Sequence, residues 1–174
     1  NQKVLIYGAS SSVGAYAIQL AKLKGAEVTA VCSAKNHALV TDLGADKTID
    51  YHVEDFIQNG EFYDVIFDVV GKLELKHALQ SLKEHGAYAH AVGTPDVAIK
   101  AALLKRKKRF KFIGGGSSKK SDDLSYLGQL LANGQIKTPI EKYYTMKDLP
   151  EAHAHVDSGR KAGNVIVQMM SLIL

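Results

Sequence analysis

The sequence predicts an α/β fold in which a doubly wound parallel six-stranded sheet is followed by a C-terminal helix/strand extension. Three observations lead to this prediction. Short apolar segments alternate with helical segments along most of the 174 residues. The first apolar segment joins its helix through a turn rich in glycine and serine, over residues 8–14. After about residue 135 the regular alternation ends, which indicates a different arrangement of the tail.

The first unit, residues 4–33, reads as strand, turn, helix and strand. Residues 4–7 are apolar or aromatic, as a strand buried on both faces requires, and a helix is expected over 13–24 with Gly25 closing it. A second strand is expected over 28–32. Unpaired N–H groups and the positive end of the helix dipole meet at such a turn and can bind a pyrophosphate. A phosphate-bearing cofactor is therefore the first hypothesis.

The turn departs from the G-x-G-x-x-G pattern of dinucleotide-binding proteins. Ala9 and Ser11 occupy the first two glycine positions, and Gly14 keeps the third. Gly14 allows the helix to pack closely on the strand, whereas Ser11 carries a Cβ where the backbone should approach phosphate. Compensation would come from the serine hydroxyls at positions 10–12. The alternative interpretation is a serine-rich N-cap that opens an ordinary helix.

The other elements of the sheet follow in order. We expect a helix over 35–43, strands at 47–50 and within 62–71, a helix over 73–83, and strands at 87–92 and 110–113. Such alternation implies right-handed crossovers with helices on both faces, which is a Rossmann-type arrangement. A ligand is then expected at the carboxyl ends of the strands, where the strand order reverses.

The tail is predicted to contain a helix over 124–132, an extended segment over 136–146, a helix over 149–158 and a strand over 164–170. These last elements need not extend the parallel sheet. We therefore expect a cofactor-binding domain over residues 1–135 and a C-terminal extension over 136–174.

Composition limits the possible functions. With 46% hydrophobic residues the chain can fill a core, and no run approaches the roughly 18 apolar residues of a membrane span. A single cysteine excludes an internal disulfide framework and a multi-cysteine zinc site, so a reducing cytoplasm is the expected location. The seven histidines form no H-E-x-x-H pattern, and we expect no metal.

The run KRKKRFK, residues 105–111, is the main argument for a different class of function. Six basic residues could bind nucleic-acid phosphates, with an aromatic ring stacked on a base. Basic side chains also commonly solvate a loop and protect a strand edge, and no nucleic-acid-binding fold accompanies this run. We expect no nucleic-acid partner and no membrane partner.

Several segments together resemble a known family. YGASSSVGAYAIQLAK, GAEVTAVCS, LGADKTIDY, YDVIFDVVG, FIGG and EAHAHVDSGRKAGNVIV resemble the nucleotide-binding part of medium-chain dehydrogenases and reductases, specifically their zinc-independent quinone oxidoreductase branch. The resemblance implies an enzyme that transfers hydride from NADPH to a quinone or an α,β-unsaturated carbonyl. Alcohol dehydrogenase-like activity, enoyl reductase activity and a non-catalytic NADPH-binding module are the alternatives.

In that family a GroES-like substrate domain precedes the strand found here at residues 3–7. The resemblance therefore implies a cofactor domain without its GroES-like partner, on which the extension 136–174 would pack. On this interpretation the isolated chain turns over substrate poorly, because much of the substrate pocket lies in the other domain. The resemblance also implies a homodimer formed through the strand at 110–113, an edge that needs cover.

The end of the second strand indicates which cofactor is bound. An NAD site usually places Asp or Glu there to accept from the ribose 2′-OH. Here no carboxylate occurs between Glu27 and Asp42, and a hydroxyl, an ammonium and an amide are available from Ser33, Lys35 and Asn36. These groups favour the 2′-phosphate of NADP(H). The resemblance places Tyr51 near the same phosphate.

The resemblance also places cofactor contacts at the ends of the later strands, although it assigns no catalytic acid or base. The full set of expected contacts is Ser10, Ser11, Ser12, Val13, Gly14, Ser33, Lys35, Asn36, Tyr51, Val70, Gly71, Val92, Gly93, Thr94, Ile113, Gly114, Gly115 and Asn164. Asp68 is expected to cap the turn after its strand rather than to catalyse. Cys32 lacks an evident base partner and is expected to be a small buried residue.

Overall fold

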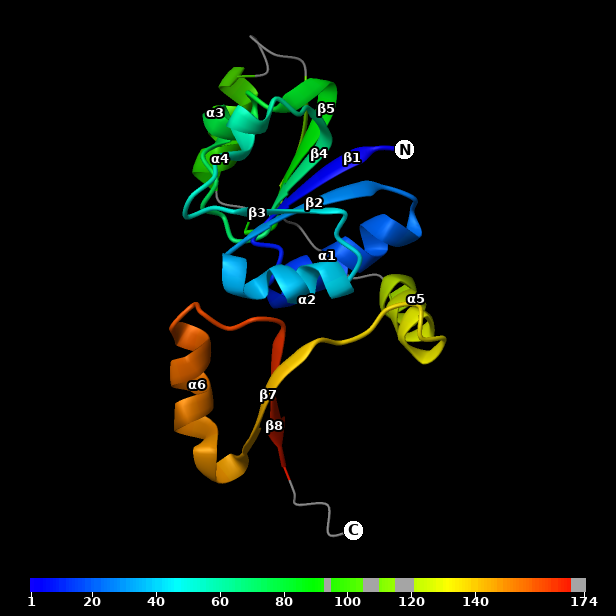
Figure 1. The fold of residues 1–174 in the computed structure, drawn as a ribbon, viewed down its shortest axis with the longest axis vertical. Helices are drawn as coiled ribbons and strands as arrows, with labels where there is room; N and C mark the ends of the chain where they lie inside the picture. Colours follow the sequence, from blue (N-terminus) through cyan, green and yellow to red (C-terminus); the bar gives the residue numbers. More distant parts are fainter. Residues whose placement is uncertain (93–94, 105–109, 115–120, 170–174) are drawn as a thin grey trace.

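The main feature of the fold is a single parallel sheet of six strands (Figure 1). The computed structural model describes residues 1–92, 95–104, 110–114 and 121–169. The spatial order is β3-β2-β1-β4-β5-β6, and each neighbouring pair is parallel. The strands are β1 (Lys3–Tyr7), β2 (Glu27–Cys32), β3 (Lys47–Asp50), β4 (Tyr63–Asp68), β5 (Leu82–His90) and β6 (Lys111–Gly114). The strand order reverses between β1 and β4, so the predicted doubly wound, Rossmann-type fold is confirmed.

Helices cover both faces of this sheet. They are α1 (Ser12–Leu23), α2 (His37–Asp42), α3 (Leu75–Ala78) and α4 (Pro95–Leu104), with short 3₁₀ turns at Ala34–Asn36 and Phe56–Asn59. Helix α5 (Ser121–Ala132) lies apart from the sheet (Figure 1) and contributes to neither core. Adjacent residues of β1 serve different cores: Ile6 packs with residues of α1 and α2, whereas Leu5 packs with residues of α3 and α4. This burial on both faces explains why the central strands are continuous apolar runs. No helix in the described part of the chain is long and apolar enough to cross a membrane.

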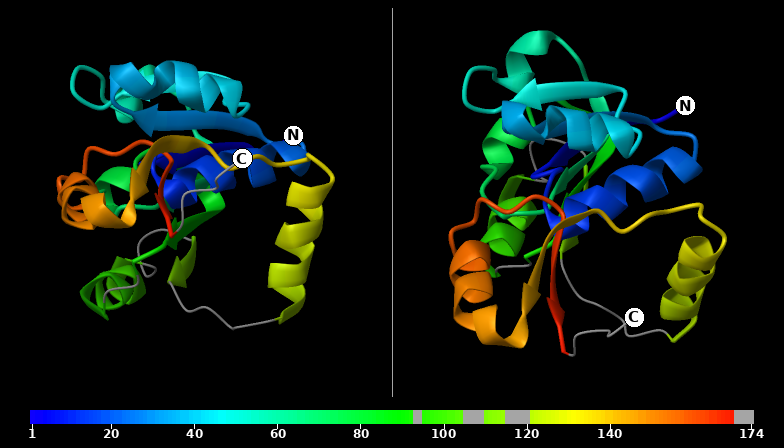
Figure 2. Two further views of the ribbon diagram at one scale, coloured as in Figure 1. Left: turned by 90° about the horizontal axis from the view of Figure 1, so that it is seen from below. Right: turned by 60° about the horizontal axis from the view of Figure 1, so that its bottom comes forward.

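The tail forms a unit of its own (Figure 2). Its elements are β7 (Ile140–Thr145), a 3₁₀ turn (Met146–Asp148), α6 (Leu149–Asp157) and β8 (Asn164–Gln168). β7 and β8 pair in parallel as a separate two-stranded sheet, so the tail does not extend the main sheet, which the sequence alone left open. The expected domain boundary near residue 135 stays a prediction.

Two contacts fix the tail against α1. The Tyr16 hydroxyl lies 2.7 Å from the Thr138 hydroxyl. Gln19 donates through Nε2 to the Lys137 carbonyl at 3.0 Å and accepts from the Lys137 N–H at 2.7 Å. Because the Gln19 side chain is buried and fully engaged, the tail is held in one position relative to the first helix.

The predicted helix over 73–83 is wrong in extent. Only Leu75–Ala78 is helical, and β5 begins at Leu82 rather than at residue 87. Leu82 pairs with Tyr63, and the register then shifts before Ala87 pairs with Val65. His85 takes a left-handed φ of 64° inside this irregularity. Pairing with β4 therefore overrides the local helical pattern.

Helix α4 is absent from the sequence-based prediction. Its signals were present, because Pro95 is its first residue and Asp96 lies in its first turn. The other differences are shifts of a few residues at element ends and the 3₁₀ turn that replaces the start of the expected helix at 35–43. The 3₁₀ turns at Phe56–Asn59 and Met146–Asp148 are also absent from the sequence-based prediction.

Candidate cofactor site

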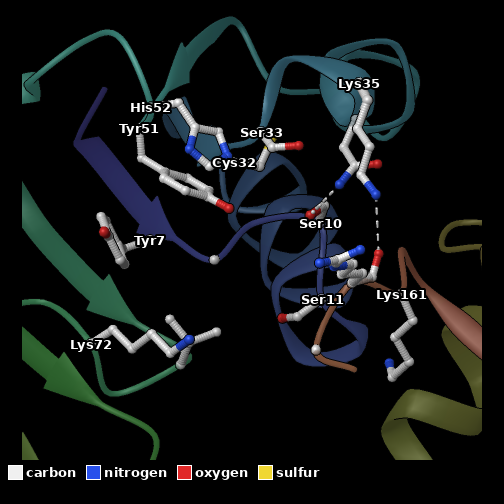
Figure 3. Close-up of a pocket in the computed structure, with 15 residues that line it drawn as sticks. Tyr7, Ser10, Ser11, Cys32, Ser33, Lys35, Tyr51, His52, Lys72 and Lys161 are labelled. Carbon is white, nitrogen blue, oxygen red and sulfur yellow. Dashed lines mark hydrogen bonds between the residues drawn. The ribbon is translucent and has the colours of Figure 1, made fainter. Parts of the chain in front are cut away.

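A cavity of about 470 Å³ opens where the carboxyl ends of the central strands meet, beside the point where the strand order reverses (Figure 3). Its walls come from the ends of β1, β2, β3 and β4 and from the loop over residues 159–161. The main sheet and the tail therefore both contribute to it. This is the position in which the topology predicts a ligand.

Two glycines shape the turn between β1 and α1. A Cβ on Gly14 would lie 2.4 Å from the Gly8 carbonyl oxygen and 2.7 Å from the Ala9 Cα. Gly8 has a φ of +84°, and a Cβ there would lie 2.7 Å from a methyl carbon of Val70. Only glycine lets α1 approach β1 this closely and lets the chain leave β1 in this direction. The role predicted for Gly14 in close packing is confirmed.

The serine hydroxyls of the turn have partners within the protein. Ser11 is the N-cap of α1, and its Oγ accepts from the Gly14 N–H at 3.1 Å. Ser10 Oγ accepts from the Asn36 side-chain amide at 3.0 Å, which ties the turn to the end of β2. Ser12 Oγ donates to the Gly163 carbonyl at 2.8 Å, which ties it to the tail. These bonds hold the backbone amides of the turn in place beside the cavity.

The cavity carries a strongly positive lining. None of the described residues that line it is Asp or Glu, whereas Lys35, Lys72, Arg160 and Lys161 are cationic. Lys35 Nζ also donates to the Arg160 carbonyl at 3.3 Å, so the end of β2 contacts the tail across the cavity. This charge distribution favours an anionic ligand.

Tyr51 and His52 close the side of the cavity beyond β3. Their rings lie 4.2 Å apart between centroids at an angle of 42°, and both line the cavity. Tyr51 keeps about half of its surface exposed, so its ring and hydroxyl are accessible to a ligand. An accessible aromatic face in a cavity lined by cationic side chains suits a purine nucleotide.

Asp68, at the end of β4, holds the loop that follows this strand through hydrogen bonds to its carboxylate. Its carboxylate is fully buried and accepts from the N–H groups of Val70 at 3.1 Å, Gly71 at 2.8 Å and Leu73 at 3.0 Å. The Tyr88 hydroxyl donates to the same carboxylate at 3.3 Å. Burial, with the Asp68 charge, raises the pKa of Tyr88, so this hydroxyl stays a donor at neutral pH. The predicted turn-capping role of Asp68 is confirmed.

Cys32 is buried, and burial raises the pKa of its thiol to about 11. The thiol is therefore protonated at neutral pH and is not an activated nucleophile. Within the described ranges no three His, Cys, Asp or Glu side chains come together as metal ligands.

The structure brings seven of the expected contact residues to the cavity, namely Ser10, Ser11, Ser33, Lys35, Asn36, Tyr51 and Val70. The other expected contacts that the structure describes do not line it. Ser12, Val13 and Gly14 form the first turn of α1, next to Ser10 and Ser11. Gly71 and Val92 adjoin each other at the ends of β4 and β5, because a Cβ on Gly71 would lie 3.1 Å from Val92 Cγ2.

Ile113 and Gly114 end β6, at the edge of the sheet away from this cavity. The Asn164 side chain donates to the Pro139 carbonyl at 3.1 Å and so helps to hold the tail rather than lining the cavity. Gly93, Thr94, Gly115 and most of the basic run at 105–111 lie outside the described residues.

Sequence reasoning missed six side chains that line the cavity: Tyr7, Cys32, His52, Lys72, Arg160 and Lys161. Tyr7 and Lys72 could have been found from topology, because they lie at or just after the carboxyl ends of β1 and β4. Arg160 and Lys161 gave no comparable signal, since they reach the cavity only through the packing of the tail on α1.

The fold and this positively charged cavity define a dinucleotide-binding α/β domain. The sequence profile of the zinc-binding dehydrogenases matches residues 43–167. The chain belongs to this family, and with it to the medium-chain dehydrogenase/reductase superfamily.

Individual relatives are consistent with this family. The chain is 33% identical over 175 residues to the chloroplastic quinone-oxidoreductase QR1 of Triphysaria versicolor, covering 97% of this chain and 53% of that protein. It is 30% identical over 191 residues to the mitochondrial NAD(P)H oxidoreductase RTN4IP1 of Danio rerio, covering 97% and 49% respectively. The chain thus spans about half the length of these relatives.

Among solved structures, the quinone oxidoreductase of Coxiella burnetii is similar with a TM-score of 0.88 and 30% identity, over 98% of this chain and 53% of that one. A thermostable alcohol dehydrogenase from Pyrobaculum aerophilum is similar with a TM-score of 0.82 and 26% identity, over 97% of this chain and 50% of that one.

Proposed function

We propose that this chain is the NADP(H)-binding domain of an oxidoreductase that transfers hydride from NADPH to a quinone or an α,β-unsaturated carbonyl. The observation that carries the proposal is the cationic cavity at the carboxyl ends of β1 and β2, in a chain of the medium-chain dehydrogenase/reductase superfamily. Relatives named as quinone and NAD(P)H oxidoreductases favour this reaction over the alternatives.

The residues present fit a dinucleotide. The cavity volume lies in the range of small-molecule and cofactor sites, and Gly8, which lines the cavity, adds no side chain to it. The backbone N–H groups of the first turn of α1 would hold the pyrophosphate. When bound, the nicotinamide supplies the hydride. The chain itself binds the cofactor and orients it along the sheet edge.

Preference for NADP(H) over NAD(H) rests on the end of β2. Ser33, Lys35 and Asn36 line the cavity there, and Tyr51 faces it from the end of β3. A carboxylate at this place would repel a 2′-phosphate, whereas a lysine ammonium can form a charge-assisted hydrogen bond with it. The sequence and the lining of the cavity thus favour the same cofactor.

We expect NADPH to bind about tenfold or more tightly than NADH, because a charge-assisted contact contributes roughly 1.5–3 kcal/mol. The double substitution Lys35→Ala with Tyr51→Phe should remove most of this preference and leave NADH affinity nearly unchanged. Calorimetric titration of both cofactors checks this, with Lys147→Ala as a charge-matched control at an exposed position outside the cavity. Equal affinity of the unaltered protein for the two cofactors would rule out the NADP(H) assignment.

The substrate class can be tested separately. In a protein that joins this domain to a GroES-like substrate domain, NADPH oxidation should be saturable with a simple quinone or an enone, whereas the isolated chain should turn over these acceptors poorly. Oxidation of a primary alcohol with NADP⁺ should be negligible. The reverse pattern would favour the alcohol dehydrogenase-like alternative. NADPH binding with no turnover of any acceptor would favour a binding module. Zinc independence and a cytoplasmic location stay predictions.

A homodimer formed along β6 is part of the proposal. β6 ends the six-stranded sheet and pairs with β5, and Ile113 on it is 55% exposed. An apolar edge strand of this kind needs cover. Ile113→Lys should shift the protein from dimer to monomer in sedimentation velocity at micromolar concentration. Val53→Lys is the matched control, because Val53 is exposed and follows β3 at the opposite edge of the sheet. A monomer in the unaltered protein would contradict the proposal.

A further inference from the structure

The loop between α6 and β8, residues 159–163, returns from the tail to the phosphate-binding turn. The Gly163 N–H donates to the Ser10 carbonyl at 2.8 Å, and the Gly163 carbonyl accepts from the Ser12 hydroxyl at 2.8 Å. Gly163 has a φ of +69°, and a Cβ there would lie 2.6 Å from the Pro139 carbonyl oxygen. Any other residue at position 163 would be strained, so Gly163 fixes the path of this loop past the turn.

The loop is also anchored from the tail side. The Ala162 N–H donates to Glu141 Oε2 at 2.9 Å, and His155 Nε2 lies 2.9 Å from the same oxygen. Burial raises the pKa of Glu141, but the hydrogen bonds with His155 and Ala162 outweigh it and hold the pKa below its ordinary value. Glu141 is thus an ionised acceptor that fixes the residue next to Lys161.

The Lys161 ammonium lies beside the first residue of α1. It donates to Ser12 Oγ at 2.6 Å and to the Gly163 carbonyl at 2.8 Å, and the side chain lines the cavity. An ammonium has three N–H donors, so one remains available for a ligand. Among the described residues no carboxylate forms an ion pair with it. A cation at the positive end of a helix dipole is unfavourable unless an anion lies close by.

We propose that Lys161 binds the cofactor pyrophosphate and supplies a positive charge at the turn in which serine replaces the second glycine. This inference rests on the proposed function, since it assigns a role within the same cavity. Lys161 and Lys35 are assigned to different phosphate groups of the cofactor. Figure 3 shows the Lys161 side chain extending away from Lys35. Lys35 faces the end of β2, where the 2′-phosphate is expected.

The two roles can be distinguished by the affinities of variants for different ligands. The pyrophosphate is common to NADPH, NADH and ADP-ribose, so Lys161→Met should weaken all three by a similar factor of about tenfold or more. Adenosine 2′-monophosphate has no pyrophosphate, and its affinity should change little. Lys161→Arg keeps the charge and should bind all ligands within a few-fold of the unaltered protein. Lys35→Met should show the opposite pattern, with NADPH and adenosine 2′-monophosphate weakened and NADH spared.

The experiment is calorimetric titration of these four ligands at one fixed salt concentration, with thermal unfolding of each variant as a check of folding. Lys147→Met is the control, because Lys147 is an exposed lysine of the same tail that does not line the cavity. Should Lys161→Met not fold, Lys161→Gln replaces it in the comparison with Lys161→Arg.

Unchanged NADH and ADP-ribose affinity in Lys161→Met would overturn the inference while leaving the proposed function intact. A loss confined to NADPH would also overturn it, because Lys161 would then serve the 2′-phosphate. If the unaltered protein binds none of the four ligands, the proposed function and this inference both fail.

Discussion

Gly14→Ala should unfold the protein at a markedly lower temperature and abolish cofactor binding. The added Cβ would lie 2.4 Å from the Gly8 carbonyl oxygen and 2.7 Å from both Cα and the carbonyl oxygen of Ala9. All three atoms belong to the backbone, so no side chain can rotate away, and α1 would have to move off β1. Overpacking commonly costs 1–3 kcal/mol, and we expect about 3 kcal/mol here because the clash is with backbone. The melting temperature should fall by about 6–12 °C.

Gly128→Ala is the matched control for this experiment. Gly128 lies inside α5, is exposed, and has nothing within 4 Å of an added Cβ. Alanine favours a helix over glycine by roughly 0.5–1 kcal/mol, so this variant should be slightly more stable than the unaltered protein. If both glycine substitutions shifted the melting temperature equally, close approach at Gly14 would not be the reason for its glycine.

Asp68→Ala is expected to have an effect of comparable size. The substitution removes the acceptor of three backbone N–H groups, those of Val70, Gly71 and Leu73, of which only the Leu73 bond is buried. The Tyr88 hydroxyl loses its bond to Asp68 and keeps the Leu73 carbonyl, 3.4 Å away, as an acceptor. A hydrogen bond to a charged group contributes about 1.5–3 kcal/mol, and partial relaxation of the loop should leave a net loss of roughly 3–5 kcal/mol. Denaturant unfolding measures this loss. Cofactor affinity should fall as well, because the loop carries Val70 and Lys72 to the cavity.

Tyr88→Phe measures the contribution of the Tyr88 hydroxyl separately from that of the turn capped by Asp68. It removes the hydroxyl, which lies 3.3 Å from the Asp68 carboxylate and 3.4 Å from the Leu73 carbonyl, and keeps the buried ring, so it should cost about 1 kcal/mol. Asp68→Ala should therefore be clearly more destabilising than Tyr88→Phe. A smaller loss for Asp68→Ala would mean that the capped turn contributes little.

The doubly wound parallel sheet could be predicted from the sequence because short apolar strands alternate with helical segments. The sequence predicts β3 at residues 47–50 and the strand at 110–113 at a sheet edge, and the structure confirms both positions apart from a shift of one residue in β6. The start of β5 could not be predicted in the same way. Leu82 and Lys83 read locally as the end of a helix, and only pairing of Leu82 with Tyr63 turns them into a strand. Tertiary pairing decided the structure there.

The candidate site likewise has one part that the sequence predicts and one part that it does not. The expected contacts on the turn, at the end of β2 and just after β3 lie at the cavity, because one βαβαβ half of the chain places them there. Lys161 contacts Ser12 across 149 positions of sequence, and no local pattern indicates such a contact. The wall supplied by the tail therefore required the structure.

A crystal structure of the protein with NADPH tests the central claim most directly. We predict electron density for the nucleotide across the carboxyl ends of β1 and β2, with the 2′-phosphate beside Lys35 and the pyrophosphate between the first turn of α1 and Lys161. Density for the nucleotide at another place, or none at a saturating NADPH concentration, would contradict the assignment of this cavity as the cofactor site.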